Sequence, residues 1–343
     1  MKINKTVIGL TFSMLLVSTV VGAADFGKGL LAAQSGDFKT ALSEWTPLAE
    51  RGHASAQYNM GVMYDDGKGV PESNKTAVKW YTLAAEQRHV YAQYNLAIMY
   101  RKGEGVLENN KTAVKWYTKA AEQGYSKAQT DLGNMYKSGR GVPESDKTAV
   151  KWYTLAAEQG YTDAQYNLAK MYENGKGVPE SDKTALKWYT LAAEQGDAES
   201  QNNLGIIYDY GKGVPESNKT ALKWYTLAAE QRHVKAQFNL GIKYDDGKGV
   251  PESDKTAVKW YTLAAEQGHA KSQYNLGIMY FEGAGVLTDN RRAYMWVNLS
   301  TYNSNDKNGP KAKNIISKKM TPADISKAQD MSSRCLESGY TDC

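Results

Sequence analysis

Cysteine is almost absent from this 343-residue sequence, which contains only Cys335 and Cys343, both near its C-terminal end. No C-x-x-C motif is present, which excludes a thiol redox centre of that type. An even number of cysteines favours a disulfide in an exported chain, and export is argued below. We therefore predict a structural Cys335–Cys343 bond, with a free thiol pair or an intermolecular bridge as the alternatives.

Motifs for common enzyme chemistries are also missing. The sequence has no H-E-x-x-H zinc motif, no G-x-S-x-G nucleophile motif and no Walker-type glycine loop. Neither sign of charge is in large excess, since 42 basic residues face 37 acidic ones. Such a mixed surface lacks the basic footprint of a nucleic-acid-binding protein. We predict no catalytic residue, no metal, no cofactor and no nucleic-acid partner.

Long hydrophobic runs are confined to the N-terminus. Lys2 and Lys5 precede an apolar run over residues 7–21, and small residues follow as far as Ala24. This pattern predicts a secretory signal peptide over residues 1–24, cleaved after Ala23 or Ala24, because the run is short for a membrane-spanning helix. No later segment is apolar enough to cross a bilayer. The mature protein is therefore predicted to be periplasmic or secreted.

What the sequence does contain is a repeat. Seven tryptophans fall 36 residues apart, and an eighth precedes the first of them by 35. They are Trp45, Trp80, Trp116, Trp152, Trp188, Trp224, Trp260 and Trp296. A period of roughly 20 to 50 residues indicates an array of structural repeats.

Each repeat contains two amphipathic helix patterns. In the copy over residues 89–124, Leu96 follows Ala92 by four residues and Trp116 follows Ala113 by three, and each pair begins a single apolar helix face. A loop of the form G-x-G-V-P separates the two patterns in most copies. Glycine can stop a helix there and proline prevents its continuation. Each unit is therefore predicted to be a helical hairpin.

The ends of the helices carry recognisable signals. An Asx residue stands at the start of every second helix, where we expect its side chain to cap free N–H groups: Asn74, Asn110, Asp146, Asp182, Asn218, Asp254 and Asn290. The four histidines, His53, His89, His233 and His269, share one repeat position. Adjacent copies lie about 10 Å apart, too far to share one metal ion, so we expect these histidines to have a structural role at the start of the first helix.

Small residues recur inside each first helix. Glycine or alanine follows the leucine of that helix, or the methionine in the first copy: Gly61, Ala97, Gly133, Ala169, Gly205, Gly241 and Gly277. Glycine inside a helix costs up to about 1 kcal/mol relative to alanine, so its recurrence predicts that a neighbouring helix passes close to it. One hairpin cannot bury its own apolar face, but a stack of hairpins can.

These motifs carry a family resemblance. The order A-Q-Y-N-L-G-x-M-Y, then G-K-G-V-P, then K-T-A-x-K-W-Y-T-L-A-A-E-Q-G resembles the Sel1-like repeat, a relative of the tetratricopeptide repeat, in seven copies over residues 53–304. The resemblance implies an all-α solenoid, a right-handed superhelix of antiparallel helix pairs. It also implies a scaffold for a protein or extended peptide partner.

The two ends of the array depart from the repeat. Residues 25–52 are predicted to form a divergent helical hairpin that caps the first repeat, because an end unit has one face without a neighbour. Residues 305–343 are predicted to cap the other end. In that segment we expect a turn at Asn308-Gly309-Pro310, a short helix over 312–320, and a last helix that begins at Thr321-Pro322 and ends near Glu337.

The copies differ from one another mainly along one face of the first helix. Tyr94, Ile98 and Arg101 have the spacing i, i+4 and i+7, and the same positions vary in the other copies. We call these three positions of all repeats the first-helix strip. Packing constrains every copy alike, so a strip that varies is either unconstrained surface or a surface shaped for a partner. Aromatic residues with polar neighbours favour the second interpretation.

The resemblance extends this hypothesis to single residues. In tetratricopeptide arrays the corresponding positions line the concave groove that holds a peptide, and the asparagine before the leucine bonds the ligand backbone. The implied partner-binding residues are Tyr58, Asn59, Tyr94, Asn95, Arg101, Asn134, Tyr166, Asn167, Lys170, Asn203, Phe238, Asn239, Tyr274 and Asn275. The alternative for the asparagines is that they bond across neighbouring hairpins or face water.

Two functions follow from the sequence. The first is a non-enzymatic, exported scaffold that binds a protein or peptide through the concave face of the array. The second is a β-lactam-binding or β-lactam-hydrolysing enzyme, since cysteine-rich relatives of the family are credited with that activity. Those relatives carry paired cysteines in every repeat, whereas the repeats of this chain contain none. No oligomeric state is predicted.

Overall fold

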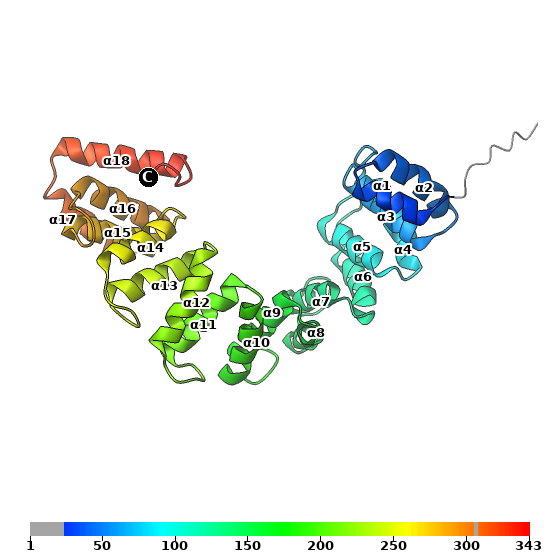
Figure 1. Ribbon diagram of the computed structural model, residues 1–343, viewed down its shortest axis with the longest axis horizontal. Helices are drawn as coiled ribbons and strands as arrows, with labels where there is room; N and C mark the ends of the chain where they lie inside the picture. The colour runs from blue at the N-terminus through cyan, green and yellow to red at the C-terminus, as the bar shows by residue number, and fades with distance from the viewer. Residues whose placement is uncertain (1–23, 305–307) are drawn as a thin grey trace, which may run out of the picture. The chain divides into compact units, whose positions relative to one another are not determined.

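The computed structural model describes residues 24–304 and 308–343, which form eighteen α-helices and no β-strand (Figure 1). The predicted signal peptide, apart from Ala24, lies outside the described residues. The helices belong to two compact units, one ending at Gln123 and the other beginning at Gly124. In both units, consecutive helices pair and the pairs stack, which confirms the predicted all-α solenoid.

The first unit contains three helix pairs. Its helices are α1 (Phe26–Gln34), α2 (Phe38–Glu50), α3 (Ala54–Asp65), α4 (Asn74–Glu86), α5 (Val90–Lys102) and α6 (Asn110–Glu122). The predicted divergent hairpin is α1 with α2, and Pro47 lies inside α2. Asp37 caps α2 by accepting a hydrogen bond from the Thr40 N–H at 3.0 Å.

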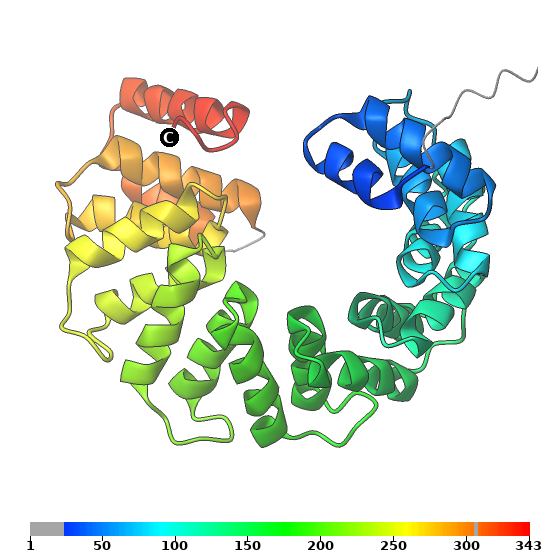
Figure 2. The same ribbon diagram turned by 45° about the vertical axis from the view of Figure 1, so that its right-hand side comes forward.

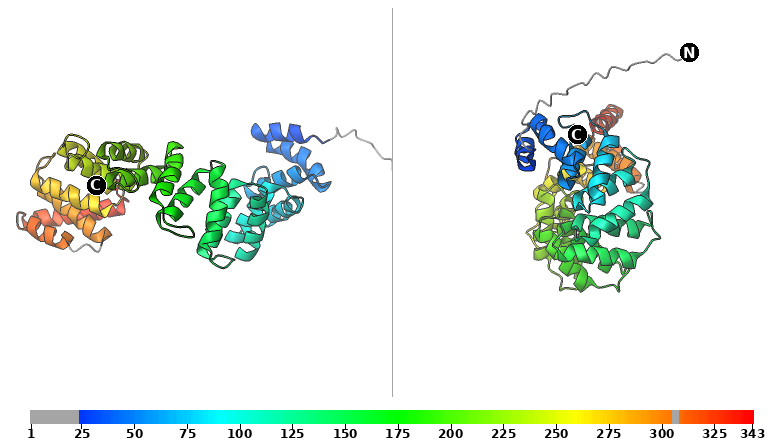
Figure 3. Two further views of the ribbon diagram at one scale, coloured as in Figure 1. Left: turned by 90° about the horizontal axis from the view of Figure 1, so that it is seen from below. Right: turned by 90° about the vertical axis from the view of Figure 1, so that its right-hand side faces the viewer.

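The second unit contains the remaining twelve helices, whose pairs stack in chain order from α7 to α16 (Figure 2). They are α7 (Ser126–Ser138), α8 (Asp146–Glu158), α9 (Thr162–Glu173), α10 (Asp182–Glu194), α11 (Ala198–Tyr210), α12 (Asn218–Glu230), α13 (Val234–Asp245), α14 (Asp254–Ala265), α15 (Ala270–Glu282), α16 (Asn290–Asn303), α17 (Asn308–Ser317) and α18 (Pro322–Glu337). The last two helices, in orange and red, lie at the end of this unit (Figure 3, left).

A row of tyrosines forms the centre of the core. Each complete repeat buries one tyrosine of its second helix: Tyr81, Tyr117, Tyr153, Tyr189, Tyr225 and Tyr261. The ring packs against the small residue of the first helix. At Gly133, an added Cβ would lie 2.6 Å from the ring of Tyr153. The predicted close approach is therefore confirmed, and the glycine makes room for an aromatic ring of the partner helix.

Buried glutamines connect the repeats. Gln201 of α11 donates from Nε2 to the Ala193 carbonyl of α10 at 3.0 Å, and its Oε1 accepts from Nε2 of Gln231 in the turn after α12 at 2.8 Å. The Ala193 carbonyl, which also accepts from the Gly196 N–H at 3.0 Å, lies at the end of α10. The Gln201 amide therefore joins three helices of two repeats. The same tie is centred on Gln57, Gln93, Gln165, Gln237 and Gln273.

The prediction that an Asx residue caps each second helix is wrong by one position. The capping residue is the one before it, as in α12, where Ser217 has extended backbone angles and its Oγ accepts from the Thr220 N–H at 3.2 Å. Asn218 is the first residue of the helix. Ser73, Ser145, Ser181, Ser217 and Ser253 cap in this way, and Asn109 and Asp289 replace the serine in two copies. The Asx side chain is therefore available for other contacts.

The histidines have the predicted structural role. Nδ1 of His89 accepts from the Ala92 N–H at 3.3 Å, and His53, His233 and His269 cap their helices in the same way. At the ends of the second helices, Arg88 and Arg232 stand where other copies have glycine. Both have the left-handed backbone expected of that position, with φ of 68° and 64°.

The C-terminal segment differs from the prediction at its start. Asn308-Gly309-Pro310 does not form a turn but begins α17. Proline is tolerated in the first turn of a helix because its missing N–H would have no partner there. Gly309 is buried against Thr301. The predicted start of the last helix is confirmed, since Thr321 caps α18 and Pro322 is its first residue.

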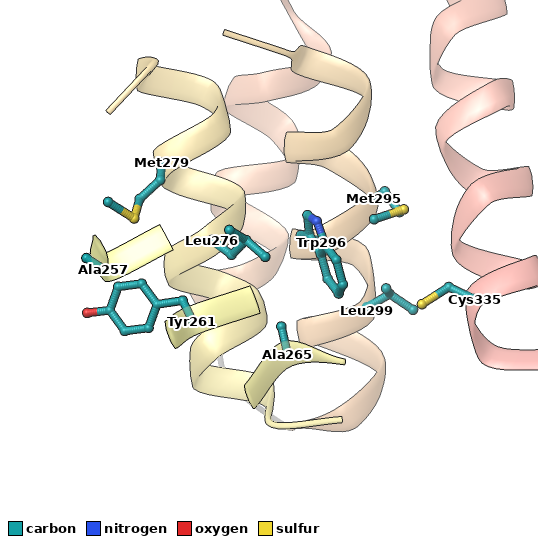
Figure 4. Close-up of a cluster of buried hydrophobic side chains, with 9 residues drawn as sticks. All are labelled: Ala257, Tyr261, Ala265, Leu276, Met279, Met295, Trp296, Leu299 and Cys335. Atoms are coloured by element: carbon teal, nitrogen blue, oxygen red, sulfur yellow. The ribbon is translucent and has the colours of Figure 1, made fainter. Parts of the chain in front are cut away.

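The predicted disulfide is present. Cys335 and Cys343 are bonded, with Cα atoms 4.7 Å apart. Cys335 is fully buried and points from α18 toward Leu299 of α16, close to Trp296 (Figure 4). The bond therefore ties the end of the chain to a residue that helps α18 cover the last repeat.

Replacing Gln201 by leucine should lower the melting temperature. The Ala193 carbonyl would keep only the Gly196 N–H and the Gln231 amide only the Leu227 carbonyl, and each lost hydrogen bond destabilises a protein by about 0.5–1.5 kcal/mol. Thermal unfolding followed by circular dichroism measures the effect, and Glu230→Ala, an exposed change on α12, is the control. Equal melting temperatures for the two variants would show that the tie does not stabilise the stack.

Candidate functional site

The predicted aromatic residues of the first-helix strip are half-buried. The half-buried residues are Tyr58, Tyr94, Tyr166, Phe238 and Tyr274. The first four pack on the buried tyrosine of their own repeat, with ring centroids 5.8–6.1 Å apart. Tyr274 instead packs beside the cluster formed by α16, α17 and α18. Each ring thus extends the core and presents its remaining surface to solvent.

The capping histidine of the following repeat covers one side of two of these rings. Tyr58 stacks on His89 at 4.7 Å, and Phe238 lies 4.8 Å from His269. Burial lowers the pKa of both His89 and His269, and Lys271 and Lys235 lower that of His269 further. Both histidines are therefore stabilised in the neutral form, which is the form that can accept the capping hydrogen bond.

Several predicted asparagines have partners within the protein. Asn95 interacts with the hydroxyls of Tyr58 and Tyr81 of the preceding repeat and acts to lower the pKa of both. Asn203 acts in this way on Tyr189, and Asn275 on Tyr261. Asn239 donates to Oδ1 of Asn202 at 3.2 Å. Asn59 and Asn167 are half-buried. The bonds that cross between hairpins show that these side chains help to hold neighbouring repeats together.

Each buried tyrosine hydroxyl reaches the solvent-facing end of the first helix. It donates to a carboxylate at the i+7 position of the strip in four repeats, as from Tyr261 to Asp245 at 3.1 Å and from Tyr189 to Glu173 at 2.8 Å. In two repeats the partner is a residue predicted to bind: Arg101 donates to Tyr117 at 3.1 Å, and Tyr153 donates to Asn134 at 2.7 Å. The third predicted polar residue, Lys170, is half-buried and lies 3.9 Å from Glu173.

Burial and neighbouring charge perturb this row of acids and phenols. Burial is the largest cause that raises the pKa of Tyr189, Tyr225 and Tyr261, and the adjacent carboxylate raises each further. Burial also raises the pKa of Asp65 and Asp245, while the tyrosine hydroxyl bound to each lowers it. The phenols therefore remain protonated and act as hydrogen-bond donors.

Sequence reasoning missed a lysine that is buried in this core. Lys243 of α13 is 3% exposed and occupies a position that holds methionine or isoleucine in the other repeats. It pairs with Asp209 of α11 and donates to Oδ1 of Asn218 at 2.7 Å. Asp209 also accepts from the Tyr225 hydroxyl at 3.3 Å. A charge buried this deeply requires such partners.

A cavity of about 380 Å³ opens beside Lys243. Its lining includes Asp209, Asn218 and Tyr225, together with Asn239 of the predicted site. Lys243 could have been found by comparing the copies at their buried positions as well as at their variable surface positions. The signal is a lysine at a repeat position that otherwise holds methionine or isoleucine.

Among the residues that the structure describes, no group of three His, Cys, Asp or Glu side chains is placed to hold a metal ion. Within the same residues, no helix is both long and apolar enough to span a membrane.

The fold and the strip define a class: a helical-repeat protein in which each hairpin adds one level to a solenoid. The profile of the Sel1 repeat matches seven consecutive segments, 54–89, 90–125, 126–161, 162–197, 198–233, 234–269 and 270–303. The chain therefore belongs to the Sel1 repeat family, as its motifs predicted. Proteins of this family typically act as scaffolds for interactions with other proteins.

Two solved structures show how far the likeness extends. A Sel1 repeat protein from Oxalobacter formigenes is 31% identical, with a TM-score of 0.67 over 83% of this chain and 88% of that one. A protective antigen present in uropathogenic Escherichia coli strains, which displays an SLR fold, is 28% identical, with a TM-score of 0.60 over 91% of this chain and 83% of that one. No protein of curated function matches the chain.

The raised pKa of Asp245 predicts a pH-dependent effect of Asp245→Asn. The folded state holds the Asp245 proton more tightly than the unfolded state does. The folded protein therefore becomes less stable as the pH rises from the ordinary pKa of this carboxyl group, 3.8, through its raised value in the folded state. Asparagine keeps an oxygen for the Tyr261 hydroxyl and carries no charge. The variant should therefore melt higher than the wild-type protein at pH 7, and this gain should disappear as the pH falls toward 3.8.

Melting curves of both proteins, recorded from about pH 3.5 to about pH 8, measure this effect, because that pH range brackets the ordinary carboxylate pKa. Glu230→Gln, which neutralises an exposed carboxylate that does not act on Asp245, is the control. A variant that melts lower than the wild-type protein at neutral pH would contradict the assignment.

Proposed function

We propose that the protein is a non-enzymatic scaffold, acting in the periplasm or outside the cell, that binds a protein or extended peptide through its first-helix strip. The observation that carries this proposal is that the repeats differ in sequence along the strip and hardly at all in their second helices. The second helices repeat K-T-A-x-K-W-Y-T almost unchanged from 75 to 262, whereas the i+4 position of the strip changes from Asn134 to Lys170 to Ile206.

The chemistry of the strip suits a protein partner. Half-buried rings such as Tyr166 and Phe238 are held in place by the core, so little conformational entropy is lost when a partner covers them. Exposed or half-buried polar groups such as Asn134 and Lys170 alternate with them along the chain. Rigid aromatic anchors with polar neighbours are the composition that protein interfaces favour.

The surroundings of the asparagines narrow the proposal. Asn95, Asn203 and Asn275 already interact with tyrosine hydroxyls of the preceding repeat, so a partner would compete with those contacts. We therefore assign the main contacts to the aromatic rings and to the i+4 side chains, and a supporting role to the asparagines.

Export is part of the proposal and has two supports. The N-terminal pattern of basic, apolar and small residues is that of a signal peptide. The Cys335–Cys343 bond is of a kind that persists in oxidising compartments and is rare in the reducing cytosol.

Site-specific photocrosslinking in the native cell envelope tests the binding surface. A photoreactive amino acid placed at Lys170, Ile206 or Ile242 should crosslink to one and the same partner protein. The same amino acid at the exposed positions Lys187, Lys223 or Lys259 of the second helices should not. Crosslinks from the second helices alone would overturn the assignment of the surface.

A β-lactam reporter assay tests the non-enzymatic part of the proposal. The purified protein should hydrolyse the reporter no faster than a mock purification does. Turnover that follows the protein through purification would overturn the scaffold as the sole function.

A further inference from the structure

The buried lysine marks a site that recurs along the array. At the boundary of the fifth and sixth repeats, the Lys243 ammonium group is held by the Asp209 carboxylate and the Asn218 side-chain oxygen, and the Tyr225 hydroxyl bonds the same carboxylate. We call the arrangement of these three partners the Asp209 seat. Its members come from the end of a first helix, the first residue of a second helix, and the buried tyrosine.

The next boundary repeats this arrangement with Asp245, Asp254 and Tyr261, which we call the Asp245 seat. The residues stand 36 positions after those of the Asp209 seat. The contact between tyrosine and carboxylate is the same, since Tyr261 donates to Oδ2 of Asp245 at 3.1 Å and Tyr225 donates to Oδ2 of Asp209 at 3.3 Å. The two seats are therefore built alike.

The two seats differ in what fills them. Met279 of α15 takes the place of Lys243, and it is 5% exposed. Figure 4 shows that the side chains of Met279 and Tyr261 point in the same direction, away from Trp296. A methionine side chain ends short of the place that the longer lysine reaches with its ammonium group. The Asp245 seat thus has the same kind of acceptors as the Asp209 seat, and no cation from the described residues occupies it.

The surrounding charge favours a cation at the Asp245 seat. Asp246, Asp254 and Glu252 all act on Asp245 to disfavour its charged form. Lys248 pairs with Asp246 at 2.9 Å, and in the described residues no lysine or arginine pairs with Asp245 or Asp254. Both of these carboxylates are half-buried, so a group from solvent can approach them.

We propose that the Asp245 seat binds the ammonium group of a lysine side chain, in the way that the Asp209 seat holds Lys243. The acidic cluster alone would not point to this ligand. The seated ammonium group one repeat earlier does, because it shows which group the arrangement accepts. The inference rests on the proposed function in one respect: the lysine is supplied by the partner protein.

The other boundaries offer weaker versions of the seat. Asp65 has an asparagine, Asn74, at the position of Asp254, so that seat has one carboxylate fewer. Glu173 already lies 3.9 Å from Lys170 of its own helix. The Asp245 seat is therefore the one that we expect to have the strongest preference for a lysine.

Binding of a small amine tests the seat without the partner. The probe is Nα-acetyl-L-lysine amide, the control ligand is Nα-acetyl-L-norleucine amide, which lacks the ammonium group, and the protein carries ¹³C-labelled methionine methyl groups. The Met279 methyl resonance should shift saturably with the lysine compound only, and the Met171 resonance should not move. Asp245→Asn should abolish the shift. An unmoved Met279 resonance, or an equal response to norleucine amide, would overturn the proposal.

An internal lysine gives a second test. Met279→Lys copies the native arrangement of Lys243, and the matched control is Met171→Lys at the same repeat position, where Lys137 stands in place of the acid. The melting temperature should fall much less for Met279→Lys than for Met171→Lys. Equal losses would mean that the seat does not accept an ammonium group. Both tests can succeed while the crosslinking experiment fails, so the seat and the proposed scaffold function are judged separately.

Discussion

A buried glutamine amide that bonds three helices is the interaction on which the rest of the structure depends. In each tie the glutamine Nε2 donates to a carbonyl at the end of the preceding hairpin, and its Oε1 accepts from the side-chain amide at the end of its own hairpin. Gln93 is an example, with Ala85 and Gln123 as its partners. A hydrogen bond buried among apolar side chains is specific, because a packing arrangement that does not form it leaves polar groups with neither a protein partner nor water. It therefore sets the register in which one hairpin packs on the next. The tyrosine row and the first-helix strip follow from that register.

Much of the fold could be predicted because it depends on local pattern. The period of the tryptophans and the apolar spacing around Leu96 predict paired helices, and the histidines indicate where the first helix begins. The Asx residue considered alone predicts the cap of the second helix one residue late. The serine before it and the threonine after it, as at Ser217 and Thr220, are the pair that bond. Proline at 310 is compatible with the predicted turn, but the first turn of a helix accepts it equally well.

The candidate site was harder to predict because it depends on contacts between hairpins. Comparing the copies was enough to find the strip, since variation is visible in the sequence. It could not show that Asn95 interacts with two tyrosine hydroxyls of the preceding repeat, because that contact depends on how far one hairpin is displaced along the next. Lys243 was visible at a position otherwise held by methionine or isoleucine. Its significance comes from Asp209 and Asn218, which lie 34 and 25 residues earlier in the chain.

The glutamine tie recognises a main-chain carbonyl and a residue type that every hairpin carries, so it does not distinguish one neighbour from another. Gln273, in the last repeat, makes the same tie with Asn303 in place of a glutamine. A gene that gained or lost one 36-residue repeat inside either compact unit would encode a chain in which the neighbouring hairpins can still form the tie. The length of such a protein is thus free to change in evolution by whole hairpins, while the end units and the individual strip residues carry what is particular to each member.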